Sequence, residues 1–227
     1  HILHTNDLHN ALTPQKAHFI RDLRQHFMPD ALLLDAGDAV KAGNLGANSR
    51  ELILRLLDDA GYDAMAMGNR ESHPTRAALT KKLQDARVPI LAANLRARQD
   101  KPAPRVVEEY LEFGFGPEED EVIVTVIGLA PQITAPDSFW ARVTDYVFDD
   151  PVKTGRGLAK KLRPETDLLI ALTHIGYERD IELAGAPDID LIIGGHSHRA
   201  VMPPERHGHA WIAATAANAT HIGHLTV

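Results

Sequence analysis

Short apolar runs alternate along the chain with stretches in which apolar residues recur every three or four positions. The runs lie at residues 2–3, 31–34, 64–67, 122–130, 167–172 and 189–193. Short apolar runs bounded by polar residues predict buried strands. The sequence therefore predicts a sheet-forming chain whose strands are separated by other elements.

The stretches between these runs have the spacing of amphipathic helices. They lie at 15–28, 49–60, 74–86 and 154–162. Two details are specific enough to test: one buried stripe of Leu52, Ile53, Leu56 and Leu57, and Pro74 in the first turn of its helix, where proline is favoured. Strands alternating with helices indicate an α/β fold.

The segment 105–130 differs, because it holds two β-rich runs. GFGP at 114–117 and an acidic cluster at 118–121 separate them, which predicts a hairpin with a solvated turn. The chain shows no repeat, low-complexity tract or linker, so we expect one continuous α/β domain over 1–227.

Composition narrows the possible functions. The chain has 227 residues with 44% hydrophobic and 24% charged side chains, as in ordinary globular proteins. A net charge of −7 without long Lys or Arg runs argues against a broad basic surface for nucleic acid, so an anionic ligand would need a metal or a placed arginine. The absence of cysteine excludes thiolate metal sites, and no apolar run approaches the roughly 20 residues of a membrane span. Neither a compartment nor an oligomeric state is predicted.

Polar residues follow the apolar runs, where sites form in open α/β sheets. Asp7 and His9, two residues apart on extended chain, offer an oxygen and a nitrogen to one cation, although such a pair also occurs in ordinary turns. Asp38 follows Gly37 and is either a bridge between two cations or a helix cap or Asx-turn. Asn69 offers a carbonyl oxygen, although Gly-Asn is also a common turn.

The last two runs end in histidines. His174 follows one of them, and His196 and His198 follow the other after two glycines. An i, i+2 histidine pair after a buried strand indicates a metal site. Together the candidates supply mixed oxygen and imidazole ligands, suited to a pair of Mn, Fe, Zn or similar ions. The candidate metal ligands are Asp7, His9, Asp38, Asn69, His174, His196 and His198.

Taken in order, these motifs resemble those of the calcineurin-like metallophosphoesterases, most closely the 5′-nucleotidase branch. VPILAANL, VIGLAPQ, LLIALTHIGY and DIDLIIGGHSH are also similar to that branch's phosphatase domain. The resemblance implies a four-layer α-β-β-α sandwich with two mixed sheets and a two-metal site at the strand ends. The nucleotidases carry a further C-terminal nucleotide-binding domain, which we do not expect in this chain, so nucleotide specificity does not carry over.

The resemblance also implies how the metals are held and used. One ion would be held by Asp7, His9, Asp38 and His198, and the other by Asp38, Asn69, His174 and His196. The ions would be divalent or trivalent Mn, Fe, Zn, Co or Ni. Two cations about 4 Å apart would lower the pKa of a bridging water to give hydroxide and would hold the phosphate for in-line attack. The implied activity is hydrolysis of a small phosphate ester.

The stretch GNRESH at 68–73 departs from the family pattern. Arg70 stands where the family has a histidine, and His73 stands where the nucleotidase branch has its paired aspartate. The donors of Arg70 suit a phosphate, but a guanidinium does not release its proton near neutral pH, so Arg70 cannot readily protonate a leaving group. His73 is the candidate acid; a helix N-terminus would disfavour its imidazolium form, whereas a bound phosphate dianion would favour it.

Three hypotheses follow. In the first, Arg70 binds the phosphate and His73 protonates the leaving group. In the second, no general acid acts and the substrates are activated, such as aryl phosphates or phosphoanhydrides. In the third, the chain is a pseudoenzyme that binds metal and a phosphorylated ligand without turnover. We favour the first, and the complete set of candidate ligands weighs against the third.

Overall fold

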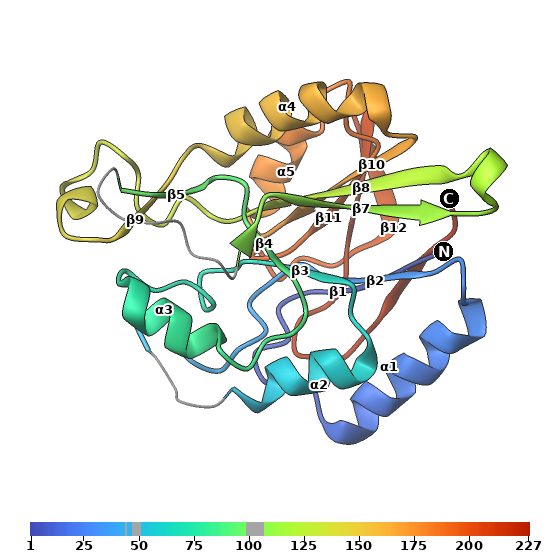
Figure 1. Cartoon of the computed structure of the whole chain (residues 1–227), viewed down its shortest axis with the longest axis horizontal. Coiled ribbons are helices and arrows are strands. Elements are labelled where there is room, and N and C mark those ends of the chain that lie inside the picture. The colour runs from blue at the N-terminus through green and yellow to red at the C-terminus, as the bar shows by residue number, and fades with distance from the viewer. Residues whose placement is uncertain (44, 47–50, 99–106) are drawn as a thin grey trace.

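The computed structural model describes residues 1–43, 45–46, 51–98 and 107–227. Two six-stranded mixed sheets stack face to face, and helices cover the outer face of each (Figure 1). The arrangement is the four-layer α-β-β-α sandwich that the resemblance implied, so that prediction is confirmed.

The first sheet contains most of the strands from the first half of the chain. Its order is β14-β1-β2-β3-β4-β6, and all neighbours are parallel except β14 and β1. The strands are β1 (Ile2–Thr5), β2 (Leu32–Asp35), β3 (Ala64–Ala66), β4 (Ile90–Leu91), β6 (Val107–Glu108) and β14 (Gly223–Leu225).

The second sheet has the order β12-β13-β11-β10-β8-β7, with a parallel centre and antiparallel strands at both edges. Its strands are β7 (Tyr110–Phe115), β8 (Val122–Leu129), β10 (Leu168–Thr173), β11 (Leu191–Gly194), β12 (Val201–His207) and β13 (Ala210–Ala214). A separate pair joins β5 (Leu95–Ala97) to β9 (Tyr146–Phe148).

All six apolar runs form strands, and β7 and β8 form the predicted hairpin. The hairpin turn is shorter than expected, because β7 continues through Phe115 and the turn begins at Gly116. Residues 105–106 of the predicted segment lie outside the described residues.

The helices are α1 (Pro14–Phe27), α2 (Leu52–Ala60), α3 (Arg76–Leu83), α4 (Pro151–Leu162) and α5 (Tyr177–Leu183), with short 3₁₀ turns η1 (Glu118–Asp120), η2 (Phe139–Arg142) and η3 (Arg163–Glu165). Helices thus occur in all four predicted stretches. Residues 49–50 of the second stretch lie outside the described residues. The helix α5 was not predicted.

Two details of the helix predictions are wrong. Leu52 is 62% exposed while Leu54 is buried, because α2 starts at Leu52 and turns this first residue away from the sheet. Pro74 precedes the first turn of α3, whose N-cap is Thr75. The chain is held there by Asp145, whose carboxylate accepts from the Arg76 N–H and whose own N–H donates to the Pro74 carbonyl.

Three apolar clusters fill the spaces between the layers. One lies between the first sheet and helices α1 to α3, another between the second sheet and helices α4 and α5, and the third between the two sheets. Residues such as Leu34 and Ile170 belong to the third cluster and have no exposed surface. Because both faces of the central strands are buried, these strands appear as continuous apolar runs in the sequence.

Candidate metal centre

The ends of five strands bring the candidate metal ligands together. Asp7 and His9 follow β1, Asp38 follows β2, Asn69 follows β3, His174 follows β10, and His196 and His198 follow β11. Parallel strands of one sheet end at the same edge, and the two sheets meet at this edge. Side chains from both sheets therefore lie close to one another.

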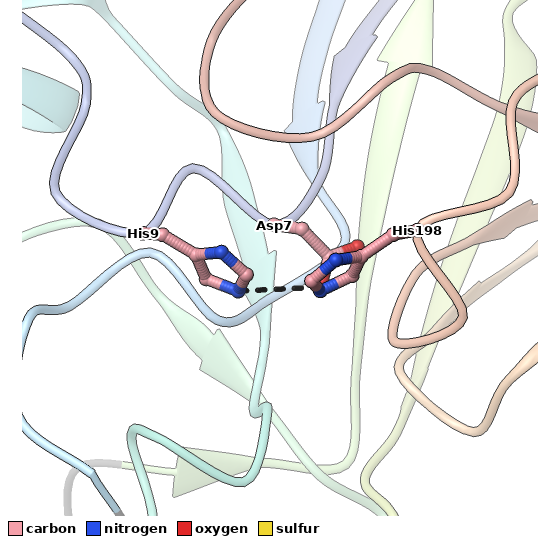
Figure 2. A group of neighbouring side chains, drawn as sticks. All are labelled: Asp7, His9 and His198. Atoms are coloured by element: carbon pink, nitrogen blue, oxygen red, sulfur yellow. Dashed lines mark ion pairs between the residues drawn. The ribbon is translucent and has the colours of Figure 1, made fainter.

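Asp7 is fully buried and its two oxygens have different surroundings. Oδ2 accepts hydrogen bonds from the side-chain amide of Asn6 at 2.9 Å and from the backbone N–H of His196 at 3.0 Å. Oδ1 has no hydrogen-bond partner among the described residues, yet it lies 3.3 Å from His198 Nε2 and 3.7 Å from His9 Nε2. Figure 2 shows the two imidazoles turned toward Asp7 from different segments of the chain.

His174 and Asp38 form the buried part of the site that joins the two sheets. His174 Nδ1 lies 2.7 Å from the Ala36 carbonyl, so Nδ1 is an N–H donor and Nε2 is the ring atom turned toward the carboxylates. That Nε2 is 3.4 Å from Asp38 Oδ2 and 3.9 Å from Asp7 Oδ1. Burial favours neutral His174, but the carboxylates of Asp38 and Asp7 outweigh burial and raise the pKa of His174 to about 9. The buried carboxylates thus attract positive charge strongly.

Three buried ligand atoms lack hydrogen-bond partners in the described part of the chain: Asp7 Oδ1, His9 Nε2 and His174 Nε2. Leaving a buried polar atom without a partner is costly, so each such atom needs an explanation. Here they converge: the ligand atoms of Asp7, His9 and His198 lie within 4.8 Å of one another, as do those of Asp7, Asp38 and His174. Carboxylate oxygens with imidazole nitrogens at these separations fit transition-metal or zinc ions.

The histidines form two pairs. The rings of His9 and His198 are 4.7 Å apart, and those of His174 and His196 are 5.1 Å apart. His196 also contacts Asn69, with 3.1 Å between Nδ1 and Oδ1. This division is the one that the resemblance implied for the two ions. Asp38 Oδ2 lies within 3.7 Å of one histidine from each pair, so it stands between the two pairs.

The backbone at the site is unusual. Eight non-glycine residues of the described chain have positive φ, and five of them are candidate ligands: Asp7 (50°), His9 (46°), Asp38 (57°), His196 (76°) and His198 (53°). The left-handed region costs such residues on the order of 1 kcal/mol or more each and is concentrated at functional sites. The strand ends are thus bent so that side chains converge. Gly37 (φ 92°) permits one bend, since a Cβ there would lie 2.8 Å from the Ala66 carbonyl oxygen.

Arg70 lies against the carboxylate cluster. Its backbone N–H donates to Asp38 Oδ1 at 2.8 Å, and its Nε is 3.7 Å from Asp38 Oδ2. Burial lowers the pKa of His9, and the charge of Arg70 lowers it further. The Arg70 side chain remains 33% exposed, so its guanidinium borders the cluster and can still reach a ligand.

His73 is engaged elsewhere. Its Nδ1 accepts from the Thr75 backbone N–H at 3.0 Å, at the start of α3. Burial and then the nearby Lys82 ammonium lower the pKa of His73. Its hydrogen bonds within the described chain are with Thr75 and the backbone of Leu45, and none reaches a candidate metal ligand.

Two supporting residues were assigned no role from the sequence. Glu71 is fully buried and accepts from the backbone N–H groups of Asp38, Val40 and Gly68 at 2.9 to 3.0 Å, so it joins the loops that follow β2 and β3. Asn6 exchanges hydrogen bonds with Thr215, so it links the end of β1 to the second sheet. Asn6 adjoins Asp7, and Glu71 lies two residues after Asn69, so proximity to predicted ligands was the signal that could have found them.

Two stacked sheets with carboxylates and imidazoles gathered at the strand ends are typical of metal-dependent hydrolases. A family model described as calcineurin-like phosphoesterase matches residues 1–200. The chain belongs to this family. Within the described residues, no helix has the length and apolar character needed to cross a membrane.

The chain is also similar to individual proteins that have been named or solved. The chain is 32% identical to the trifunctional nucleotide phosphoesterase protein YfkN of Bacillus subtilis, over 88% of this chain and 16% of that protein. It is 30% identical to protein UshA of Yersinia enterocolitica, over 92% of this chain and 42% of that protein. The 5′-nucleotidase precursor of Thermus thermophilus has a similar fold, with a TM-score of 0.79, 20% identity, and coverage of 97% of this chain and 49% of that one. The chain spans less than half the length of these relatives.

Proposed function

We propose that the protein hydrolyses a small phosphate ester with the help of two metal ions. The observation that carries the proposal is the convergence of three buried ligand atoms without hydrogen-bond partners in the described chain, from Asp7, His9 and His174. Such atoms are stabilised when a cation accepts their lone pairs. The family match supports the phosphoesterase class.

Each residue has a proposed role in holding the ions. Asp7, His9, Asp38 and His198 would hold one ion, and Asp38, Asn69, His174 and His196 would hold the other. Bound there, the ions would supply the acidity that activates water near neutral pH and the positive charge that binds phosphate oxygens. Hydrogen bonds to Ala36 and Asn6 orient His174 and Asp7 for this task.

Arg70 is proposed to bind the phosphate. Its guanidinium presents several N–H donors in a planar fork, which suits two phosphate oxygens. Its backbone is fixed to Asp38 Oδ1, so the charge is held near the metal ligands. Positive charge at this position stabilises the negative charge that develops in the transition state.

The proton for the leaving group is a separate question. Two observations weigh against His73 as the donor: its hydrogen bonds lead away from the candidate ligands, and its lowered pKa disfavours the imidazolium form near neutral pH. We therefore favour substrates whose leaving groups need no general acid, such as aryl phosphates and phosphoanhydrides.

Hydrolysis of an aryl phosphate tests the proposal. Protein loaded separately with Mn, Fe, Zn, Co and Ni should turn over the substrate with at least one metal, and Asp38→Ala should abolish turnover. Asp22→Ala is the matched control, because the Asp22 side chain on α1 is 55% exposed. No turnover with any of the five metals, together with retained binding of phosphorylated ligands, would instead identify a pseudoenzyme.

A second comparison isolates the role of His73. We expect His73→Ala to change the turnover of aryl and alkyl phosphates by similar factors. A much larger loss with the alkyl substrate would show that His73 donates the proton after all, because a poor leaving group depends on protonation.

A further inference from the structure

A lysine lies buried on the inner face of α3. Leu79, Lys82 and Leu83 have the spacing of one helix face and are all buried, and Lys82 is 1% exposed. Lysine is almost never fully buried unless it is paired. Its presence on an apolar face therefore calls for a specific set of partners.

The Lys82 ammonium has three such partners. Nζ donates to the carbonyl oxygens of Arg70 at 2.8 Å, Ser72 at 2.8 Å and Gly43 at 2.9 Å. An ammonium has three N–H donors, so the group is fully used. Burial lowers the pKa of Lys82 to about 8, although Glu71 and other acids oppose the shift.

These partners lie on the two loops that carry Asp38 and Arg70. Gly43 belongs to the loop after β2, whereas Arg70 and Ser72 belong to the loop after β3. Glu71 joins the same two loops through their backbone N–H groups. Glu71 thus accepts from N–H groups of both loops, and the Lys82 ammonium donates to carbonyls of both loops.

The result is that Arg70 is held on both sides of its backbone. Its N–H donates to Asp38 Oδ1, and its carbonyl accepts from Lys82. With both groups fixed, the side chain extends from a held backbone, and its Nη1 donates to the Lys41 carbonyl at 3.5 Å. None of the three hydrogen bonds of Lys82 goes to a candidate metal ligand.

We propose that Lys82 is a positioning residue that holds the Arg70 backbone so that the guanidinium faces the substrate phosphate. The proposal rests on the phosphate-binding role of Arg70 proposed above. It assigns Lys82 an effect on turnover that is transmitted through Arg70 and is separate from metal binding.

A double-mutant cycle with an aryl phosphate tests this inference. Lys82→Met keeps the length of the side chain and removes its donors. It should lower kcat/KM roughly tenfold to a hundredfold, since small misplacements of a substrate-binding group have effects of that size. Metal content should remain equal to that of the unchanged protein. In an Arg70→Ala background the same substitution should have almost no further effect.

Two further variants make the result interpretable. Lys81→Met is the matched control, because Lys81 is the exposed neighbour on the same helix. Lys82→Gln keeps two N–H donors, so it provides a folded comparison if Lys82→Met does not fold, and it should lose less activity.

Three results would overturn the proposal. Unchanged kcat/KM with a lower melting temperature would make Lys82 purely structural. An equal loss with and without Arg70 would show that Lys82 acts by another route. If Arg70→Ala itself leaves turnover unchanged, the role of Arg70 fails and the inference fails with it, whereas metal-dependent hydrolysis would stand.

Discussion

The two sheets contribute unlike halves to the candidate metal centre. The first supplies Asp7 and Asp38, which are buried and accept backbone hydrogen bonds, together with the partly exposed His9 and Asn69. The second supplies buried His174, but also His196 and His198 on an exposed loop, with the His198 side chain 50% exposed. Buried carboxylates must be supported by the fold, because an uncompensated buried charge is costly. The exposed imidazoles of His196 and His198 instead remain in contact with solvent.

The two sheets nevertheless share one structural feature. In each, the threonine that ends a strand before a ligand segment donates to a buried carboxyl group. Thr5 donates to Asp35, and Thr173 donates to Asp180, both at 2.6 Å. Burial raises the pKa of each carboxyl to about 8, so both are neutral acids over most of the physiological pH range. The two strand ends are thus fixed by carboxyl groups that are mostly protonated at neutral pH.

The largest effect on metal binding should come from the buried carboxylates of the first sheet. Asp7→Asn keeps the shape of the side chain but removes its charge, so metal affinity should fall by more than the roughly 10- to 100-fold typical of residues that support ligands. Added metal should not restore turnover. Calorimetric titration with Mn measures this, and Asp22→Asn serves as the surface control. Unchanged affinity would show that the buried carboxylates do not dominate metal binding.

Arg70 should affect turnover without affecting the ions. Arg70→Ala removes transition-state charge stabilisation and should lower kcat on the order of a hundredfold with aryl and alkyl phosphates alike. Arg70→Lys should recover part of the loss, because it keeps the charge but not the fork. Steady-state kinetics at saturating metal would provide the values. A variant that also loses metal would place Arg70 among the residues that hold the centre together.

The exposed histidines of the second sheet should have a smaller effect on metal binding, which added metal can reverse. His198→Ala removes one half-exposed imidazole, so we expect a loss of roughly tenfold in the affinity for one ion. High metal concentration should then restore most of the turnover. Measuring activity against metal concentration for this variant and for Asp7→Asn compares the exposed histidines with the buried carboxylates directly. Equal and irreversible losses in both would remove the distinction between them.

The smallest effect concerns stability and comes from the buried carboxyl groups that accept from the strand-end threonines. Asp180 has a folded pKa of about 8 against an ordinary value of 3.8, so between these two pH values only the folded chain keeps this proton. Stability should therefore fall as pH rises through that window, by up to about 1.4 kcal/mol per unit. Asp180→Asn should flatten the fall. Thermal unfolding of metal-free protein at several pH values checks this, and an unchanged pH dependence would contradict it.

The sequence predicted the central strands well because they are buried on both faces and appear as apolar runs. It did not predict β12, whose residues 201–207 include two prolines and several polar side chains, or the short polar helix α5. These elements are set by pairing and packing with distant segments.

The candidate ligands were found because they directly follow the apolar runs. Their left-handed backbones have no sequence signal beyond a modest preference of Asp, Asn and His for that region. Lys82 could have been noticed as a lysine between Leu79 and Leu83 on an apolar face, but its carbonyl partners come from two distant loops. The sequence raised the question of Arg70 and His73, and only the folded structure places Arg70 beside Asp38 and His73 beside Thr75.

Anomalous diffraction from crystals grown with Mn is the most direct test of the two-metal account. We predict two peaks per chain, one among Asp7, His9, Asp38 and His198 and one among Asp38, Asn69, His174 and His196, with Asp38 between them. A single peak, or metal bound only away from these side chains, would contradict the account.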